Sequence, residues 1–255
     1  MAPIEERGAL WRYTPQPNSN SDSNPANPGW ELLTPASPTA PYPASRSYHA
    51  MTSNGRDTLY LHAGCPAQGR LADVWAFHVP TRAWTELPAA PPPARGGASV
   101  AVLGGKLYRV NGFDGERERG GAVDVLDLER EEEGWASVDF APDGVSGPEA
   151  RSVGALVAVR AKGREWLVVL FGERDPSSLG HAGAGKMLGD VWAFDVEGGK
   201  WVRVEPKGDG PVPVARGWFG ADVVTGGDGE QAVIVHGGLA EDNSRLGDVW
   251  KLEFE

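Results

Sequence analysis

The sequence predicts an all-β protein, and more closely a β-propeller built from four-stranded antiparallel blades. Three observations support this fold class. Short apolar segments recur four times in the same order, the 255 residues include 35 Gly and 21 Pro, and long helical periodicity is missing. One repeat of about fifty residues cannot bury its own apolar faces, so each repeat is expected to pack against its neighbours, as propeller blades do.

Each repeat opens with an arginine that follows a Pro-rich or Gly-rich approach and precedes an apolar strand. These arginines are Arg46, Arg95, Arg151 and Arg216. The second strand of each repeat is the most apolar and ends in glycine, with expected ranges 58–64, 106–112, 165–172 and 231–238. The third strand alternates between apolar and polar residues, and the fourth carries a tryptophan. In three repeats nine residues separate the third-strand and fourth-strand positions, namely Trp75 and Trp84, Leu126 and Trp135, and Trp192 and Trp201.

The repeats divide one propeller domain, 1–255, into successive blades. A partial blade is expected over 10–45, with a polar insert at 16–29, followed by blades over 46–94, 95–150 and 151–215 and a second partial blade over 216–255. Seventeen strands are expected in total, which is not a multiple of four. The sequence thus indicates about four to five blades of an N-terminally incomplete six-bladed propeller. Its unpaired sheet edges would make the chain prone to association.

Composition restricts the partners and the compartment. The formal net charge is −11 at pH 7, whereas a surface for nucleic acid or anionic membranes would be basic. Cys65 is the only cysteine, which rules out an internal disulfide and favours a reducing, cytoplasmic location. No apolar stretch approaches the ~20 residues of a membrane span, and no secretory signal is readable. The expected partner is a small molecule or another protein.

Antiparallel alternation places the four arginines on the same face of the propeller as the loops that follow the second strands. The longest of these loops, 172–189, contains Glu173, Asp175, His181 and Lys186. Carboxylate and imidazole side chains together suit iron or another borderline divalent ion. The alternative for the same loop is a solvated connection with no ligand.

The glycine after the second strand, the Asp-Val-Trp of the third strand and the tryptophan of the fourth are typical of Kelch repeats. The chain resembles the Kelch family from about Leu10 to its C-terminus. The segment FGERDPSSLGHAGAGKMLGDVWAFD is similar to the corresponding stretch of the nitrile-specifier, epithiospecifier and thiocyanate-forming proteins of glucosinolate breakdown and of their microbial relatives. The resemblance implies a Kelch propeller with a lyase-type activity on a small sulfated or sulfur-bearing substrate.

The same resemblance implies Fe(II) as cofactor. The iron signature of the specifier proteins is a glutamate, an aspartate four residues later and a histidine four residues further. Glu173 and His181 match the two ends, and Ser177 stands in the middle position. Asp175, two residues before Ser177, is the nearest carboxylate that would supply the missing oxygen.

Two interpretations of the four arginines remain open. Several guanidinium groups at one channel mouth would bind a sulfate or carboxylate of the substrate bidentately. Alternatively, they pair with acidic groups or loop carbonyls of the adjacent blade, for which Asp114, Glu116, Glu173, Glu241 and Asp242 are suitably placed. The function is open as well: a non-catalytic protein-interaction module and an inactive truncated gene product are the alternatives to specifier activity. No catalytic residue is identified.

Overall fold

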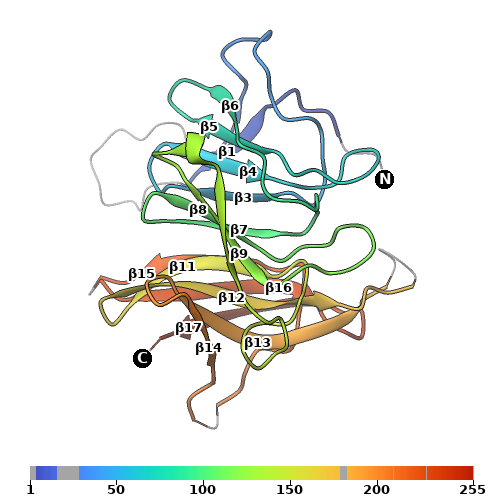
Figure 1. Cartoon of the computed structure of the whole chain (residues 1–255), viewed down its shortest axis with the longest axis vertical. Coiled ribbons are helices and arrows are strands. Elements are labelled where there is room, and N and C mark those ends of the chain that lie inside the picture. Colours follow the sequence, from blue (N-terminus) through green and yellow to red (C-terminus); the bar gives the residue numbers. More distant parts are fainter. Residues whose placement is uncertain (1–3, 16–28, 179–182, 209, 228, 255) are drawn as a thin grey trace.

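The computed structural model describes residues 4–15, 29–178, 183–208, 210–227 and 229–254, and within these ranges it contains the seventeen strands expected from the sequence. An N-terminal hairpin precedes three four-stranded sheets and one three-stranded sheet (Figure 1). The hairpin consists of β1 (Leu10–Thr14) and β2 (Gly29–Leu33). The first sheet contains β3 (Ala50–Ser53), β4 (Thr58–His62), β5 (Val74–His78) and β6 (Ala83–Leu87).

The next two sheets have the same antiparallel order. The second contains β7 (Ser99–Leu103), β8 (Lys106–Val110), β9 (Ala122–Asp127) and β10 (Trp135–Asp139), and the third contains β11 (Ala155–Ala161), β12 (Arg164–Arg174), β13 (Lys186–Asp195) and β14 (Lys200–Val204). The last sheet contains β15 (Gly220–Thr225), β16 (Gln231–Leu239) and β17 (Arg245–Glu253). A 3-10 turn, Glu131–Glu133, connects β9 to β10.

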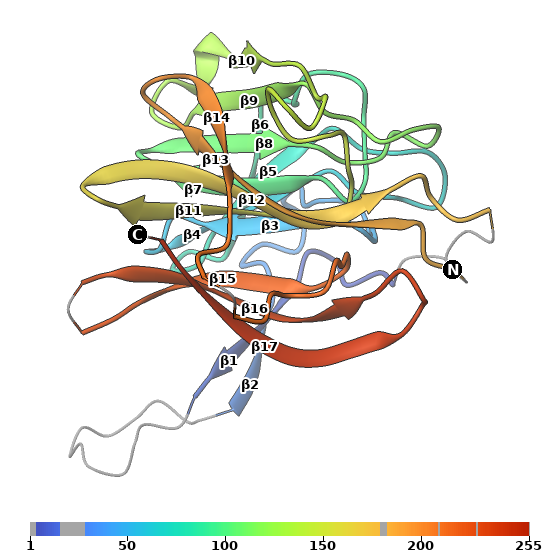
Figure 2. The same cartoon turned by 90° about the horizontal axis from the view of Figure 1, so that it is seen from below.

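The first strands of consecutive sheets lie side by side on the inner side of the propeller. β3 contacts β7, β7 contacts β11, and β11 contacts β15. Figure 2 shows the sheets stacked one behind another, with the β1–β2 hairpin projecting from the main body. The all-β blade architecture predicted from the sequence is therefore confirmed. The blade boundaries in the sequence and the six-fold closure stay predictions, and most of the polar insert 16–29 lies outside the described residues.

Apolar side chains fill the spaces between sheets. In β12, Leu167, Val168, Val169 and Leu170 are all at most 1% exposed, because neighbouring sheets cover both faces of this strand. Continuous apolar runs of this kind are typical of strands that are buried on both faces. Aromatic rings complete the packing: Trp201 lies 5.1 Å from Phe194 and 5.3 Å from Phe140 between ring centroids, which joins the third sheet to the second.

A chain of backbone hydrogen bonds links the sheets near the channel axis. The amide of Gly97 donates to the carbonyl of Tyr48 (2.8 Å), Val153 to Gly97 (2.9 Å) and Trp218 to Val153 (3.0 Å). Each of these residues stands two positions after the arginine of its repeat, and all have positive φ, from 49° to 61°. Three of the four are not glycine, so the surrounding structure maintains a strained backbone conformation at this point.

Candidate functional site at the loop-bearing end of the propeller

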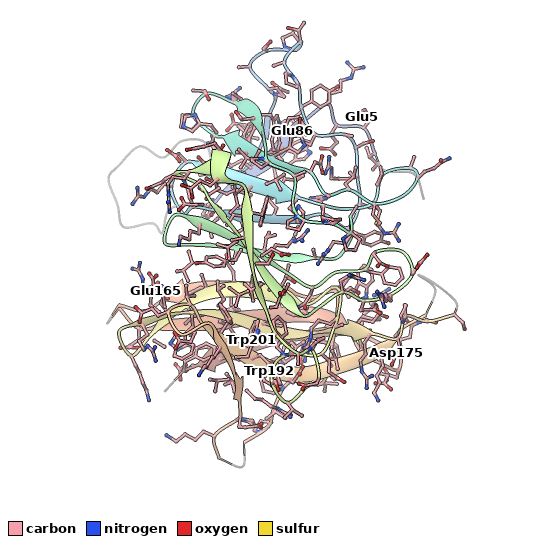
Figure 3. All side chains as sticks on the ribbon, viewed as in Figure 1. Glu5, Glu86, Glu165, Asp175, Trp192 and Trp201 are labelled. Carbon is pink, nitrogen blue, oxygen red and sulfur yellow. The ribbon has the colours of Figure 1, made fainter. Side chains whose placement is uncertain are left out.

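The repeat arginines and the loops after the second strands lie at the same end of the molecule, as the strand alternation predicts. Isolated antiparallel bridges join Ser47 to Cys65, Gly96 to Phe113, Ser152 to Glu173 and Gly217 to Leu239. Each bridge connects the residue after a repeat arginine to the residue that follows the second-strand glycine. In Figure 3, Glu165 and Asp175 mark the two opposite ends of β12, and Asp175 lies at the loop-bearing end.

Arg151 shows how the arginines are held. Its Nε donates to the carbonyl of Glu149 (3.0 Å), Nη1 donates to the carbonyl of Phe171 (3.0 Å), and Nη1 and Nη2 form a bidentate pair with the Asp190 carboxylate (2.6 and 2.9 Å). The side chain is fully buried. Arg46 and Arg216 repeat this arrangement with Asp73 and Asp248 and with the carbonyls of Ala63 and Gly237.

This arrangement corrects the expected partners of the arginines. The carboxylates that pair with Arg46, Arg151 and Arg216 come from the Asp-Val-Trp segment of the same blade, and not from an adjacent blade or from the acidic loop residues. The reason is geometric: the second strand lies between the first and the third, and the guanidinium reaches the aspartate at the end of the second strand, where it also binds the carbonyl of Ala63, Phe171 or Gly237. In these three blades the guanidinium donors are already engaged, so substrate binding at Arg46, Arg95, Arg151 and Arg216 stays a prediction.

The surroundings of the paired aspartates favour the charged form of their carboxyl groups. Burial acts to raise the pKa of Asp190, but the Arg151 guanidinium and the indole of Trp192 offset this and bring the pKa below its ordinary value. Asp73 shows the same balance with Arg46 and Trp75. Trp192 Nε1 donates to Asp190 Oδ2 (2.6 Å), so the tryptophan of the Asp-Val-Trp segment serves both the core and the ion pair.

Glu173 fastens the long loop and connects two blades. The carboxylate is buried; its Oε1 accepts a hydrogen bond from the Gly185 amide (2.5 Å) and its Oε2 accepts one from Trp218 Nε1 (3.2 Å). Burial, followed by the charges of Glu173 and Asp175, raises the pKa of the neighbouring Glu118. Two further carboxylates thus lie close enough to Glu118 to disfavour its charged form.

The structure describes the predicted metal site only in part. Asp175 is exposed and pairs with Arg174 (3.3 Å), Ser177 is partly buried, and His181 lies outside the described residues. Among the residues that the structure describes, no three His, Cys, Asp or Glu side chains form a group that would hold a metal ion. The described donors therefore do not complete an iron site.

Two aromatic residues that the sequence analysis did not select lie at the centre of this face. The rings of Tyr48 and Trp218 meet edge to face with centroids 5.2 Å apart, although they belong to the first and last sheets. Trp218 keeps 37% of its surface exposed. The signal in the sequence was the position two residues after each arginine, which holds a large aromatic side chain in these two repeats.

Arg70 is the cation beside this aromatic pair. It lies on the loop between β4 and β5, with its guanidinium 5.8 Å from the centroid of Phe113, and its Nη1 donates to the carbonyl of Gly69. The described ion pairs give it no carboxylate. A Cβ placed on Gly96 would lie 3.6 Å from Tyr48 Cβ and 3.7 Å from Arg70 Cδ, so these side chains share one surface. Tyr48, Arg70, Phe113, Glu173 and Trp218 are called the mouth cluster below.

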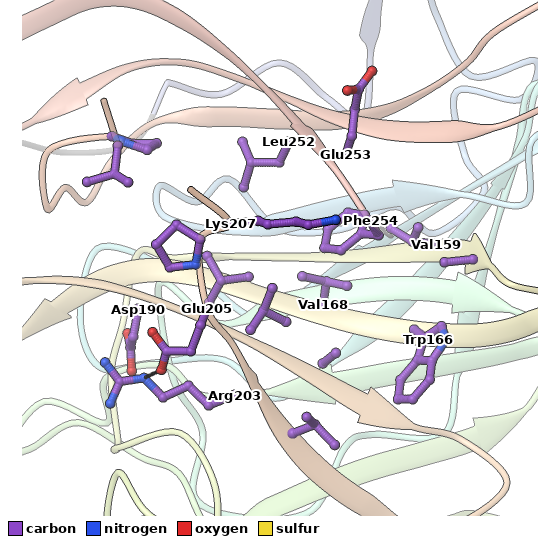
Figure 4. Close-up of a pocket in the computed structure, with 18 of the residues that line it drawn as sticks. Val159, Trp166, Val168, Asp190, Arg203, Glu205, Lys207, Leu252, Glu253 and Phe254 are labelled. Carbon is purple, nitrogen blue, oxygen red and sulfur yellow. Dashed lines mark ion pairs between the residues drawn. The ribbon is translucent and has the colours of Figure 1, made fainter. Parts of the chain in front are cut away.

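A groove of about 1110 Å³ lies elsewhere, between the third sheet and β17 (Figure 4). Val159, Val168 and Leu252 supply aliphatic walls, and the Arg203–Glu205 ion pair (3.0 Å) lies on one side. Several charged groups that line the groove are already paired, namely Asp190 with Arg151, Arg203 with Glu205 and Lys251 with Glu253. The mouth cluster is therefore the better candidate site.

Comparisons with known proteins agree with the fold. The model of the KLHDC2/KLHL20/DRC7 Kelch-repeats domain matches residues 23–238. The chain is 28% identical to N-(sulfonatooxy)prop-2-enimidothioate sulfolyase of Thlaspi arvense over 238 residues, which cover 82% of this chain and 62% of that protein.

Two further relatives from Arabidopsis thaliana contain the repeats within much longer chains. Serine/threonine-protein phosphatase BSL2 is 31% identical over 62% of this chain and 14% of its own length, and acyl-CoA-binding domain-containing protein 4 is 29% identical over 66% and 23%. The chain thus spans less than two thirds of the length of each of these curated relatives. No helix in the described residues is long and apolar enough to cross a membrane.

Proposed function

The chain belongs to the Kelch-repeat family, and on that premise we propose that it is a specifier-like protein acting on a small sulfated, sulfur-bearing substrate at the mouth cluster. The observation that carries the proposal is the similarity to the sulfolyase over 82% of the chain. We place this activity in the cytoplasm, in keeping with the free Cys65.

The chemistry of the mouth cluster suits such a substrate. Tyr48 and Trp218 offer aromatic faces for an apolar side chain, and Arg70 offers a guanidinium for a sulfate group. When sulfate leaves, the N–O bond breaks and its electron pair stays on the sulfate oxygen. An adjacent cation stabilises the negative charge that develops there. Because the other nearby cations, Arg119 and Arg174, are paired with carboxylates, Arg70 is the proposed sulfate-binding residue.

The activity test uses N-(sulfonatooxy)prop-2-enimidothioate, the compound in the relative's name, and measures sulfate release and the product composition. Arg70→Ala is expected to lower kcat/KM about 10-fold or more, because it removes a charge-assisted hydrogen bond. Trp218→Ala is expected to raise KM. Trp30→Ala is the matched control, since Trp30 is 70% exposed on the β1–β2 hairpin. Equal rates with and without the protein would refute the proposal.

Fe(II) binding is a separate proposal that rests on Glu173, His181 and the resemblance to the specifier proteins. A hydroxyl at Ser177 is a poorer iron ligand than a carboxylate. Anaerobic Fe(II) titration is therefore expected to show at least 10-fold tighter binding for Ser177→Asp than for the native chain, and no binding for His181→Ala. Equal affinities of the native chain and Ser177→Asp would remove iron from the proposed function.

The relatives in which the repeats form a minor part of a long chain favour a second function, protein binding through the same face. The Kelch fold does not by itself determine function, and a propeller without catalytic activity is able to serve as a protein-binding module. The two functions are separated by the variants above: a protein partner lost with Trp218→Ala but retained with Trp30→Ala, together with unchanged sulfate release, indicates the binding module.

A further inference from the structure

The second blade lacks the aspartate that holds the repeat arginine in the other three. In the second blade, Arg109 of β8 lies opposite Asp124 of β9. The equivalent pair in the first blade is Leu61 of β4 and Trp75 of β5. Asp124 therefore occupies the tryptophan position of the Asp-Val-Trp segment. Two residues earlier, Ala122 stands where Asp73, Asp190 and Asp248 stand in the other blades.

Arg95 keeps the rest of the arrangement without this carboxylate. Its Nε donates to the carbonyl of Pro93 (3.2 Å) and its Nη1 to the carbonyl of Asn111 (3.0 Å), as in the other repeats. The described ion pairs give Arg95 no acidic partner, although the residue is only 7% exposed. Burial, followed by the charge of Arg109, lowers the pKa of Arg95 to about 10, so it stays protonated at neutral pH.

No neighbouring carboxylate replaces the missing one. Asp124 Oδ2 accepts from Nε and Nη2 of the fully buried Arg109, and its Oδ1 accepts from the Ser137 hydroxyl (2.6 Å). Arg109 Nη1 is buried without a hydrogen-bond partner. His62 adds no further positive charge, because burial, followed by Arg109, lowers its pKa to about 3 and leaves it neutral. Asp114 is a further carboxylate that acts on Arg95, but it pairs with Arg119 (3.5 Å). The buried Arg95 and Arg109 therefore share one carboxylate, that of Asp124, which leaves one positive charge to be compensated.

We infer that the second blade binds a small oxyanion, of the size of formate, against Arg95 at the place that an aspartate carboxylate occupies in the other blades. Ala122 has only a methyl group at this position, so the chain itself supplies no carboxylate there. The position is reachable from solvent, since the side chains of Asp73, Asp190 and Asp248 are 21%, 16% and 36% exposed. The anion accepts from the guanidinium edge that the aspartates use, a bidentate geometry that arginine favours.

This site is independent of the proposed function, because it concerns a structural anion within one blade and not the mouth cluster. It predicts that stability depends on the anion in the buffer. Sodium formate is expected to raise the Tm of the native chain by about 2–4 °C relative to a bulky sulfonate salt at equal ionic strength. Ala122→Asp supplies its own carboxylate, so this variant is expected to melt higher without formate and to lose the formate response.

Two further variants make the test decisive. Ala122→Asn has nearly the same size as Ala122→Asp without its charge, and it is expected to gain no stability. Asp190→Ala opens the equivalent space beside Arg151, so its lowered Tm is expected to recover partly in formate. Equal formate responses of the native chain and Ala122→Asp, or equal Tm values for Ala122→Asp and Ala122→Asn, would overturn the inference.

Discussion

Replacement of Arg151 by methionine is expected to lower the free energy of unfolding by about 3 kcal/mol, near the lower end of the range for broken buried ion pairs. The substitution leaves Asp190 without its bidentate partner and the carbonyl of Phe171 without its donor. The cost stays near the lower end because the Asp190 side chain is 16% exposed and water can reach part of it. Urea denaturation followed by tryptophan fluorescence measures the change.

Arg160→Met is the matched control in the same sheet. Arg160 also pairs with a carboxylate, that of Glu165 (2.9 Å), but its side chain is 72% exposed. Exposed pairs contribute about 0–1 kcal/mol, so this variant is expected to unfold almost as the native chain does. A double-mutant cycle of Arg151→Met with Asp190→Asn isolates the coupling between the two side chains. Equal effects of Arg151→Met and Arg160→Met would contradict the structural role of the buried arginine.

The position of the arginines was predictable from the sequence, but their partners were less so. Strand alternation alone placed Arg46, Arg95, Arg151 and Arg216 on the loop-bearing face, because it depends only on the number of strands between them. The aspartate partners lie within the third strand or directly before it, where a half-buried pattern also accounts for them as solvent-facing residues. The overlooked signal is that the aspartate and the tryptophan of the Asp-Val-Trp segment occur together. Three repeats contain both residues, and the second repeat contains neither at these positions.

The mouth cluster was not predictable for a different reason. Tyr48 and Trp218 meet because the backbone has positive φ at both residues, and sequence patterns favour glycine or asparagine for that conformation. Arg70 is a loop residue whose place depends on the contact of its loop with Gly96 and Phe113. Glu173 was selected as a metal ligand, and the structure shows it bound to Gly185 and Trp218, contacts that the spacing of its neighbours does not encode.

Gly172→Ala is expected to destabilise the third blade by about 3 kcal/mol, from two separate causes. The residue has φ of 116°, and a Cβ built on it would lie 2.8 Å from the carbonyl oxygen of Ser152. The backbone conformation alone costs an L-residue about 1–3 kcal/mol, and overpacking adds about 1–3 kcal/mol. Because Ser152 forms an antiparallel bridge with Glu173, the strain would also displace the loop-bearing end of β12.

Gly115→Ala separates these two causes. Gly115 has φ of 109° in the loop between β8 and β9, close to that of Gly172, and no atom lies within 4 Å of a Cβ placed there. This variant is expected to lose only the conformational part, about 1–3 kcal/mol. A larger loss for Gly172→Ala therefore measures the contact with Ser152, and this contact explains why glycine ends the second strand even where the residue before it varies from Ala63 to Phe171. If the two alanine variants unfold at the same urea concentration, backbone conformation alone selects the glycine, and close approach of the first strand plays no part.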